Sequence, residues 1–388
     1  MEPFDDPICC GGAVHDRTPK LDRARFLSSA AGAAAGLAAF QTAPGTTGIP
    51  IPSALAAGAN QLVILGTAAG PPPVPGLTGI STALKLGDRV YVIDCGRSSV
   101  TQYANAKLGF TNLAGIFITH LHADHVCDLW NFFLLGAGWA SPTDSLRKAI
   151  PVYGPASPGL PLPPAYPPGR QVPTAVPANP VPGIKTLVDR CNEAFAYSTN
   201  VLVRDSGIMD LRRLADVREI PLPNAGAKPL GPTAPPMKPV TIAQLPDCTV
   251  TGILVEHGIC FPSYAFRFDT EGGSVVFSGD TALCSNMVTL AKGADVLVHE
   301  AVDLQYFKDH GYSSTLLAHL KGSHTDIGDV ASVAQAAGVP RVIVTHLAPG
   351  GLVTTAQWLA GAKQGAKKAG YTGQIGIAED LAVYDLRG

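Results

Sequence analysis

The segment 119–125 (Thr-His-Leu-His-Ala-Asp-His) places three imidazoles and one carboxylate within seven consecutive residues. An apolar run over 114–118 precedes it and predicts a buried strand. Alternate side chains of an extended backbone point to the same side, so we expect His120 and His122 to face one point. Asp124 and His125 follow a turn and can face a second point nearby. Because imidazole and carboxylate are common metal ligands, the segment predicts a metal site between a strand and a helix over 123–135.

The same pattern, an apolar strand that ends in Asp or His, recurs elsewhere in the chain. The strands expected at 90–93, 273–277 and 341–345 lead into Asp94, Asp280 and His346. A strand at 296–298 similarly leads into His299 and Glu300. Strand ends on one edge of a layered fold converge on a single cleft, so these residues can meet in space.

The composition limits the class of protein without identifying it. The 388 residues are 46% hydrophobic and carry a formal net charge of −2. This length is sufficient for one large domain or two smaller ones, and the near-neutral charge gives no global signature of nucleic-acid binding. The eight cysteines form no CxxC pairs, apart from the adjacent Cys9 and Cys10, so they predict neither a zinc ribbon nor a dense disulfide scaffold.

Residues 1–56 are predicted to be an export signal and leader. The sequence Arg-Ala-Arg-Phe-Leu at 23–27 is similar to a twin-arginine signal, although Ala24 stands where the second arginine belongs. An apolar Ala/Gly stretch follows, and Ala54-Leu-Ala56 offers a cleavage site before Ala57. We therefore expect an exported protein (periplasmic, cell-envelope or extracellular) that uses a twin-arginine-like route. Stable membrane insertion is not expected because the stretch is short and rich in glycine.

Residues 57–388 are predicted to form the folded domain, with a proline-rich insertion at about 151–240. Twelve prolines occur between residues 151 and 182, which favours an irregular, partly polyproline II structure there.

From about Gln61 to Asp385 the chain resembles the metallo-β-lactamase superfamily. The residues that carry the resemblance are Asp94, His120, His122, Asp124, His125, His257 in Val-Glu-His-Gly, Asp280 in Ser-Gly-Asp-Thr, and His346 in Val-Thr-His-Leu. The resemblance implies an α/β fold, the four-layer αβ/βα sandwich of two mixed sheets flanked by helices. It also implies two Zn²⁺ ions per chain, one bound by His120, His122 and His257, the other by Asp124, His125 and His346, with Asp280 bridging them. Manganese or iron could occupy such a nitrogen and oxygen site. Asp94 would brace the ligand loop.

Within the superfamily the chain is most similar to the tRNase Z, arylsulfatase and cyclic-nucleotide phosphodiesterase branch. The similar segments are 65–70, 93–96, 117–122, 153–155, 298–301 and 324–325. His324 precedes His346 by 22 positions, as the proton-donating histidine of that branch precedes its last ligand. The resemblance therefore implies that His324 is the general acid, while Asp124 binds metal and orients the attacking hydroxide. Glu300 and His299 would support the ligands, although His299 could equally be a buried histidine with no such role.

One departure from tRNase Z bears on the substrate. The branch carries a long tRNA-gripping arm between the positions of His257 and Asp280, but here only 22 residues separate them. The large insertion lies between His125 and His257 and is proline-rich rather than basic. We therefore expect an exported dinuclear zinc hydrolase that cleaves small phosphodiester or sulfate esters through a metal-bridging hydroxide. Its pocket would include Tyr153, Tyr166 and Trp139.

The expected partner is a small-molecule ester rather than a nucleic acid, and a homodimer is left open. Three alternatives use the same residues. The hydroxide could attack an acyl group, as in a lactonase or thioesterase. The chain could be a tRNase Z-like endoribonuclease. It could also be a secreted binding protein with a structural metal, although an open coordination position disfavours that interpretation.

Overall fold

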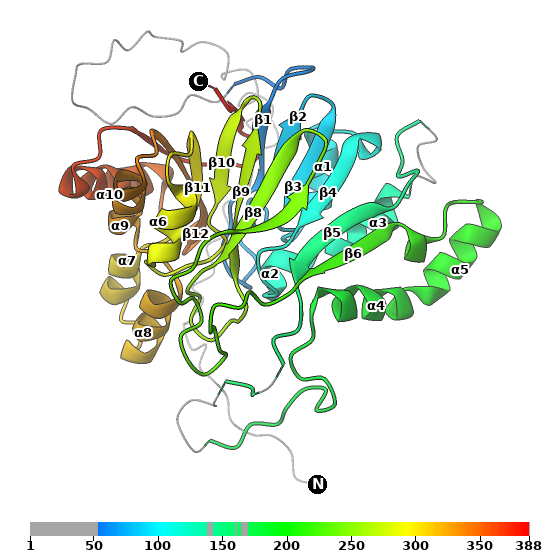
Figure 1. Ribbon diagram of the computed structural model, residues 1–388, viewed down its shortest axis with the longest axis horizontal. Coiled ribbons are helices and arrows are strands. Elements are labelled where there is room, and N and C mark those ends of the chain that lie inside the picture. Colours follow the sequence, from blue (N-terminus) through cyan, green and yellow to red (C-terminus); the bar gives the residue numbers. More distant parts are fainter. Residues whose placement is uncertain (1–52, 138–142, 160, 164–169, 388) are drawn as a thin grey trace, which may run out of the picture. The chain divides into compact units, whose positions relative to one another are not determined.

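The computed structural model describes residues 53–137, 143–159, 161–163 and 170–387 (Figure 1). Within these residues the strands form two seven-stranded sheets. The first sheet consists of β1 (Gln61–Gly66), β2 (Ser81–Leu86), β3 (Arg89–Ile93), β4 (Leu113–Phe117), β5 (Ile150–Pro155), β6 (Ala215–Ile220) and β14 (Val383–Asp385), in the order β14-β1-β2-β3-β4-β5-β6. The second consists of β7 (Val240–Gln244), β8 (Cys248–Leu254), β9 (Tyr264–Thr270), β10 (Gly273–Phe277), β11 (Val296–Val302), β12 (Arg341–Ala348) and β13 (Gln374–Ile377), in the order β13-β12-β11-β10-β9-β8-β7. Both sheets are mixed: β1–β2 and β8–β9 are antiparallel, whereas β3–β4 and β11–β12 are parallel.

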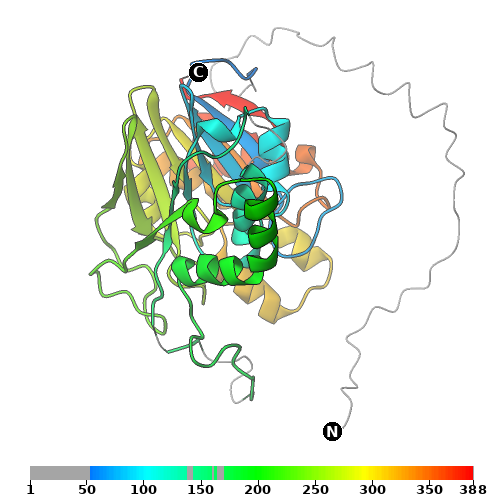
Figure 2. The same cartoon turned by 90° about the vertical axis from the view of Figure 1, so that its right-hand side faces the viewer.

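Helices cover the outer face of each sheet (Figures 1 and 2). The first sheet carries α1 (Ser99–Asn105), α3 (Leu129–Gly136) and α4 (Ile184–Ala194), and the second carries α6 (Ser285–Ala291), α9 (Ile327–Ala337) and α10 (Thr355–Ala369). The remaining helices are α2 (Ala123–Val126), α5 (Ala196–Asp205), α7 (Leu304–Asp309) and α8 (Ser314–Ser323). Three separate apolar clusters fill the spaces between these layers. One lies between the two sheets, one between the first sheet and its helices, and one between the second sheet and its helices. This layering confirms the predicted four-layer αβ/βα sandwich.

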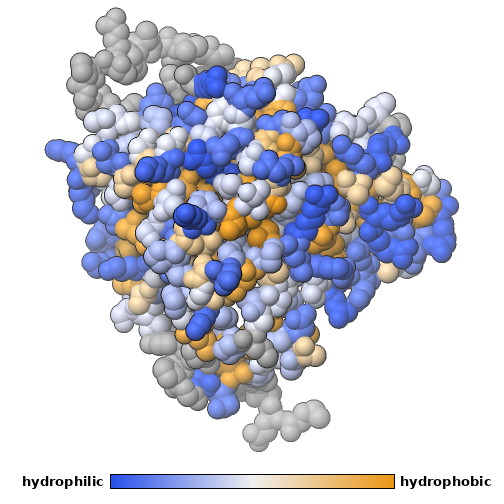
Figure 3. All heavy atoms as spheres, viewed as in Figure 1, coloured by the Kyte–Doolittle hydropathy of each residue, from blue (hydrophilic) through white to orange (hydrophobic). Residues whose placement is uncertain are grey.

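The alternation of side chains along β1 shows how the sequence produces these layers. Leu62 and Ile64 join the cluster between the two sheets, whereas Val63 and Leu65 join the cluster beneath the helices. Because successive side chains of a strand point to opposite faces, a strand covered on both sides is apolar at nearly every position. The same rule accounts for the continuous apolar runs in β4, β11 and β12. On the outer surface, hydrophilic side chains cover α4 and α5 (Figure 3).

Three predicted element boundaries differ in the structure. The helix expected over 123–135 is two helices, α2 and α3, because the Asp128 carboxylate accepts a hydrogen bond from the Val100 amide at 2.8 Å and ties the break to α1. Strand β11 continues through His299 and Glu300 to Val302, and β12 continues through His346 to Ala348. The two strands remain paired beyond a register shift after Glu300, and this pairing extends both of them past the predicted ends.

Most of the predicted leader, and part of the proline-rich insertion, lie outside the described residues. Of the leader, residues 53–56 are described, and they hydrogen-bond to the domain. Ser53 Oγ donates to Asp385 Oδ2 at 2.7 Å, and Lys85 Nζ donates to the Ala56 carbonyl at 2.9 Å. Between β5 and β6, residues 156–159, 161–163 and 170–183 are irregular, and α4 and α5 follow them. No helix among the described residues is both long and apolar enough to cross a membrane.

The aromatic contact between the sheets generates a test of the fold. Phe117 is fully buried, stacks on Tyr153 at a centroid distance of 4.6 Å and meets Phe268 edge-on at 5.0 Å. We expect Phe117→Ala to lower the free energy of unfolding by about 3–5 kcal/mol, because the structure around a cavity at this position can relax only partly. Urea unfolding of the chelator-treated protein measures this change without a contribution from metal binding. The control Leu135→Ala, at a position 57% exposed in α3, should change the free energy by no more than about 0.5 kcal/mol. A loss below about 1 kcal/mol for Phe117→Ala would contradict its central place in the core.

Candidate metal centre

The predicted metal-binding segment leaves the first sheet at the end of β4. Residues 118–122 are not helical, and α2 begins at Ala123 with His122 at its N-cap in an extended conformation. His120 and His122 therefore precede the helix, while Asp124 and His125 lie on it. The change from extended backbone to helix separates the four side chains into two pairs, as the sequence pattern predicts.

The second sheet supplies the other predicted ligands. His257 follows β8, Asp280 follows β10, and His346 lies within β12 at a positive φ of 46°. The structure brings these three residues together with the four from 120–125. The ends of both sheets are therefore needed to assemble the site.

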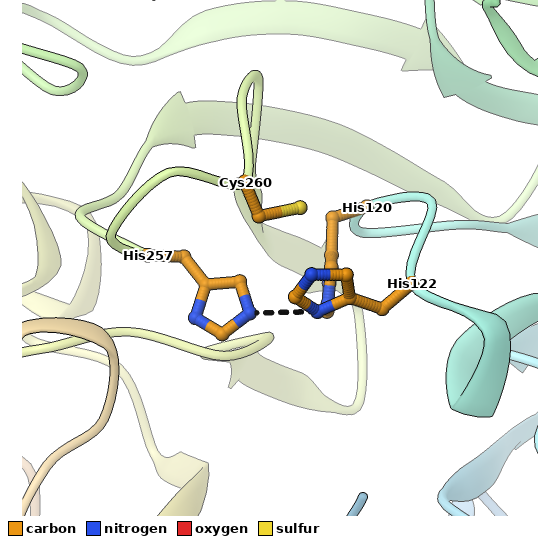
Figure 4. A group of neighbouring side chains, drawn as sticks. All are labelled: His120, His122, His257 and Cys260. Atoms are coloured by element: carbon orange, nitrogen blue, oxygen red, sulfur yellow. Dashed lines mark hydrogen bonds between the residues drawn. The ribbon is translucent and has the colours of Figure 1, made fainter. Parts of the chain in front are cut away.

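His120, His122 and His257 form the first group, which we call the three-histidine subsite (Figure 4). His122 Nδ1 lies 3.1 Å from His120 Nε2 and 3.0 Å from His257 Nε2. His120 and His257 are buried, whereas His122 is exposed at the mouth of the site.

Asp124, His125 and His346 form the second subsite. His125 Nε2 lies 3.3 Å from His346 Nε2, and Asp124 Oδ2 lies 3.4 Å from His346 Nε2 and 3.6 Å from His125 Nε2. The amide of Gly70 donates to Asp124 Oδ2 at 3.0 Å and holds that carboxylate in place.

Asp280 lies between the two subsites. Its Oδ2 is 3.8 Å from His120 Nε2 and 3.6 Å from His257 Nε2 on one side. On the other side it is 3.4 Å from His125 Nε2 and 3.3 Å from His346 Nε2. This is the position from which one carboxylate can reach cations in both subsites.

The donor atoms fit two metal ions. Zinc–nitrogen bonds of about 2.0–2.1 Å in tetrahedral geometry place neighbouring nitrogens roughly 3.3 Å apart, close to the spacings of the imidazole nitrogens in both subsites. Asp280 Oδ1 is buried and has no hydrogen-bond partner among the described residues, which leaves its lone pairs available to a cation. The set therefore suits a dinuclear centre, and nitrogen and oxygen donors accept zinc, manganese or iron.

The protonation states of the histidines bear on metal binding in the two subsites. Burial and the nearby imidazole of His125 lower the pKa of His120, and burial lowers the pKa of His257 to about 3. Both rings are therefore neutral at pH 7, which is the form that binds metal. Burial alone would lower the pKa of His125 too, but the carboxylates of Asp280 and Asp94 outweigh it and raise that pKa. Without metal, a proton on His125 balances these carboxylates, and a divalent ion bound there would displace that proton.

Asp94 supports the ligand loop from behind. Its carboxylate accepts hydrogen bonds from the amide and the hydroxyl of Thr119, both at 2.8 Å, and lies 2.8 Å from His125 Nδ1. The contact with Nδ1 leaves His125 Nε2 free to face the second subsite. Gly96 packs the same loop closely, because a Cβ there would lie 2.6 Å from the Asp124 carbonyl oxygen.

His324 lies at the edge of the site, directly after α8. Its Nδ1 is 3.3 Å from Glu300 Oε2 and 4.0 Å from Asp280 Oδ2. Burial alone would lower its pKa, but the Glu300 carboxylate outweighs burial and raises the pKa to about 9. Glu300 is itself held by the amides of Thr281 and Thr325, which donate to its Oε1 at 3.1 and 3.0 Å. Glu300 thus keeps a protonated imidazole beside the subsites.

Other residues singled out in the sequence take different places. His299 is fully buried, and its Nδ1 donates to the Glu300 carbonyl at 2.7 Å rather than to a ligand side chain. Tyr153 stacks on Phe117 in the core between the sheets and does not line the metal site. Trp139 and Tyr166 lie outside the described residues.

Sequence reasoning missed three contributors. The Ser323 carbonyl accepts a hydrogen bond from His257 Nδ1 at 2.7 Å, and the Gly70 amide holds Asp124. Backbone groups leave no signature in a sequence. The third, Cys260, lies within 4.8 Å of the three-histidine nitrogens, and its position three residues after His257 could have indicated it.

A pocket of about 380 Å³ opens beside Asp124. Its lining includes Gly70, Pro71, Pro72, Arg97 and Cys127. Arg97 places a guanidinium in this lining, where Nη2 donates to the Leu77 carbonyl at 2.9 Å. Of the predicted metal ligands, Asp124 is the one in this lining.

The three-histidine subsite can be tested by metal content. His122→Ala removes the nitrogen that lies 3.1 Å from His120 Nε2 and 3.0 Å from His257 Nε2, so we expect the variant to retain fewer ions per chain and to lose turnover. Mass spectrometry of the metals after dialysis measures the loss. The control is His310→Ala, which alters an exposed histidine that stacks on Tyr306. Unchanged metal content in His122→Ala would contradict the assignment.

Two family models match the chain. The model described as metallo-beta-lactamase superfamily matches residues 74–136, and the model described as beta-lactamase superfamily domain matches residues 181–347. The first match includes the segment 120–125, and the second includes His257, Asp280, His324 and His346.

Known relatives and solved structures resemble the chain over most of its length. Ribonuclease Z of Mycobacterium bovis (strain BCG / Pasteur 1173P2) is 25% identical over 322 residues, which are 83% of this chain and 96% of the relative. Ribonuclease Z of Mycobacterium avium (strain 104) is 27% identical over 323 residues, with the same coverage of 83% and 96%. The short form of human tRNase Z superposes with a TM-score of 0.53 at 20% identity, covering 84% of this chain and 100% of that one. The metallo-beta-lactamase fold protein YhfI from Bacillus subtilis gives 0.52 at 14% identity, covering 84% and 98%. At these identities the two structures show the shared fold.

These relatives correct one expectation from the sequence. The expectation of a small-molecule ester rather than a nucleic acid as the partner is contradicted, because the chain aligns with nearly the whole length of proteins named ribonuclease Z. Net charge describes the entire surface, whereas nucleic-acid binding depends on the local distribution of charge near the site.

The predicted resemblance to the tRNase Z branch is confirmed by these relatives. Taken together, the two family models, the relatives and the shared sandwich show that the chain belongs to the metallo-β-lactamase superfamily.

Proposed function

We propose that this hydrolase is a metal-dependent phosphodiesterase of the ribonuclease Z type that cleaves a phosphodiester bond in RNA. The observation that carries the proposal is the convergence of two ligand groups on Asp280 with the His324–Glu300 pair beside them. The similarity to ribonuclease Z over 83% of the chain supports RNA as the substrate.

Each group of ligand residues would hold one metal ion, and the two ions together would supply the nucleophile. His120, His122 and His257 would hold one ion, and Asp124, His125 and His346 the other, with Asp280 between them. Such a pair of ions supplies a hydroxide at neutral pH and stabilises the charge that develops on phosphate oxygens. The protein fixes the geometry through Asp94, which orients His125, and through the Ser323 carbonyl, which orients His257.

His324 would act as the general acid. Its imidazole is protonated at neutral pH because Glu300 raises the pKa to about 9. Hydrolysis of RNA releases a ribose hydroxyl, which is a poor leaving group unless it receives a proton. A protonated imidazole 4.0 Å from the central carboxylate Asp280 is close enough to the subsites for this role.

Arg97 would help to position the substrate. Its guanidinium lines the pocket beside Asp124, and arginine binds phosphate groups through paired hydrogen bonds. A backbone phosphate next to the scissile bond is a suitable occupant of this pocket.

A second candidate function is hydrolysis of small phosphodiester or sulfate esters. It is favoured by the turn between β9 and β10, where only Glu271 and Gly272 connect the strands, so no long arm lies between His257 and Asp280. The exported location that residues 1–56 favour is part of this candidate. Acyl-ester or lactone hydrolysis remains a third reaction that the same ligands would support.

A matched substrate panel tests the proposal. We expect the metal-loaded full chain to cleave a tRNA precursor with kcat/KM at least roughly 100-fold above that for bis(p-nitrophenyl) phosphate, p-nitrophenyl sulfate or a p-nitrophenyl acyl ester, which corresponds to about 2.7 kcal/mol. His122→Ala serves as the control for contaminating nucleases. Cleavage of the small diester or the sulfate without cleavage of RNA would instead support the second candidate, and a preference for the acyl ester would overturn both.

The acid role of His324 generates a separate prediction. We expect His324→Ala to reduce kcat/KM on RNA by roughly 10²–10⁴-fold, because the ribose oxygen leaves without a proton donor. The loss on bis(p-nitrophenyl) phosphate should be much smaller, because nitrophenolate leaves as an anion. His319→Ala, in the same helix α8 but outside the ligand groups, is the matched control. Equal losses of His324→Ala on both substrates would remove the acid role.

A further inference from the structure

Cys260 approaches the three-histidine subsite from the loop between β8 and β9. Figure 4 shows its sulfur directed toward the side of the subsite formed by His120. One nitrogen from each of these histidines and the Cys260 Sγ all lie within 4.8 Å of one another. A sulfur atom therefore joins the three nitrogens around a common point.

The loop that carries Cys260 is fixed at both ends. Val255 N donates to the Ser263 carbonyl at 2.9 Å and closes the loop between β8 and β9. Within the loop, Cys260 N donates to the His257 carbonyl at 3.0 Å, and this turn folds Cys260 back toward the histidine. Gly258 allows the turn, because its φ is +55° and a Cβ at this position would collide with the Ser323 hydroxyl. The backbone thus fixes the position of the Cys260 Cα and Cβ beside the subsite.

The spacing suits coordination by one ion. A tetrahedral zinc ion holds a nitrogen and a sulfur ligand roughly 3.6 Å apart, given bonds of about 2.0–2.1 Å and 2.3 Å. Binding would therefore draw Sγ inward by about 1.2 Å at most from the observed limit of 4.8 Å. Rotation about the Cα–Cβ bond can supply a movement of this size without a change in the loop.

We propose that Cys260 is a sulfur ligand of the ion in the three-histidine subsite, and that it makes this subsite selective for zinc over manganese. The thiol releases its proton to solvent when the sulfur binds the ion. Thiolate favours zinc and similar soft ions, whereas the carboxylate-containing second subsite also suits manganese. Because three nitrogens and this sulfur would fill a tetrahedral zinc ion, the hydroxide of the proposed function would be held by the ion in the second subsite. The two subsites would thus differ in the metals that they accept.

The other cysteine near the centre provides a comparison. Cys127 is exposed and follows His125 by two residues, and it lines the pocket beside Asp124. It belongs to none of the candidate metal groups among the described residues. A signal from sulfur coordination should therefore depend on Cys260 and not on Cys127.

Cobalt substitution tests the proposal independently of the substrate. The full chain is stripped with a chelator and reloaded with Co²⁺, and the near-ultraviolet absorption band from thiolate-to-cobalt charge transfer is recorded. We expect the band in the unaltered protein and in Cys127→Ser, and its loss in Cys260→Ser. We also expect Cys260→Ser to weaken zinc binding by at least roughly 10-fold, which is the loss of metal affinity typical when a residue that supports a ligand is removed. Manganese binding should not change.

Two outcomes would overturn the proposal: absence of the band in the unaltered protein, or its persistence in Cys260→Ser. If Cys260→Ser does not fold, alkylation of the unaltered protein gives the answer. Zinc should then slow the labelling of Cys260 relative to the chelator-treated protein while the labelling of Cys191 in α4 stays constant, and equal Cys260 rates would contradict coordination. These measurements involve no substrate, so they stand or fall separately from the proposed ribonuclease activity.

Discussion

The buried carboxylate of Asp280 is the constraint on which the site depends. It is 2% exposed and lies within 3.8 Å of four imidazoles. A carboxylate buried without compensation costs several kcal/mol, and burial alone would raise its pKa. The imidazoles of His346 and His125 outweigh burial and hold the pKa of Asp280 well below its usual value. Because the imidazoles come from both sheets, the charge is compensated only where the two sheets meet, and the sandwich is what assembles the centre.

The sequence predicted those parts of the structure that follow from local periodicity. The apolar run before Thr119 predicted β4, and the alternation of His120 and His122 predicted that both would face one point. The ends of helices and strands that depend on contacts with distant residues were not predictable in this way. The helix expected over 123–135 is divided because the Asp128 side chain binds the amide of Val100, which is 28 residues away. His346 similarly lies inside β12 rather than at its end, because pairing with β11 continues past it.

The groups that support the metal ligands also differ in whether the sequence could reveal them. Glu300 was recognisable because it follows an apolar strand, and the structure places it against His324 at 3.3 Å. The Ser323 carbonyl and the Gly70 amide were not recognisable, since every residue carries such groups. Cys260 falls between these cases. Its spacing from His257 was visible in the sequence, but only the turn at Gly258 shows that the thiol folds back toward the histidines.

The distribution of charge around the centre bears on how RNA would be recognised. The basic side chains of α4 are already paired, Lys185 with Asp189 and Arg190 with Glu193, each at 2.6 Å. Using them to bind phosphates would require these ion pairs to open. Arg97, in contrast, pairs with no carboxylate among the described residues and lines the pocket beside Asp124. Since the β9–β10 turn is also short, contacts with a phosphate would come from residues close to the site, of which Arg97 is one. We therefore expect recognition to act on the nucleotides adjoining the scissile bond rather than on distant parts of the RNA.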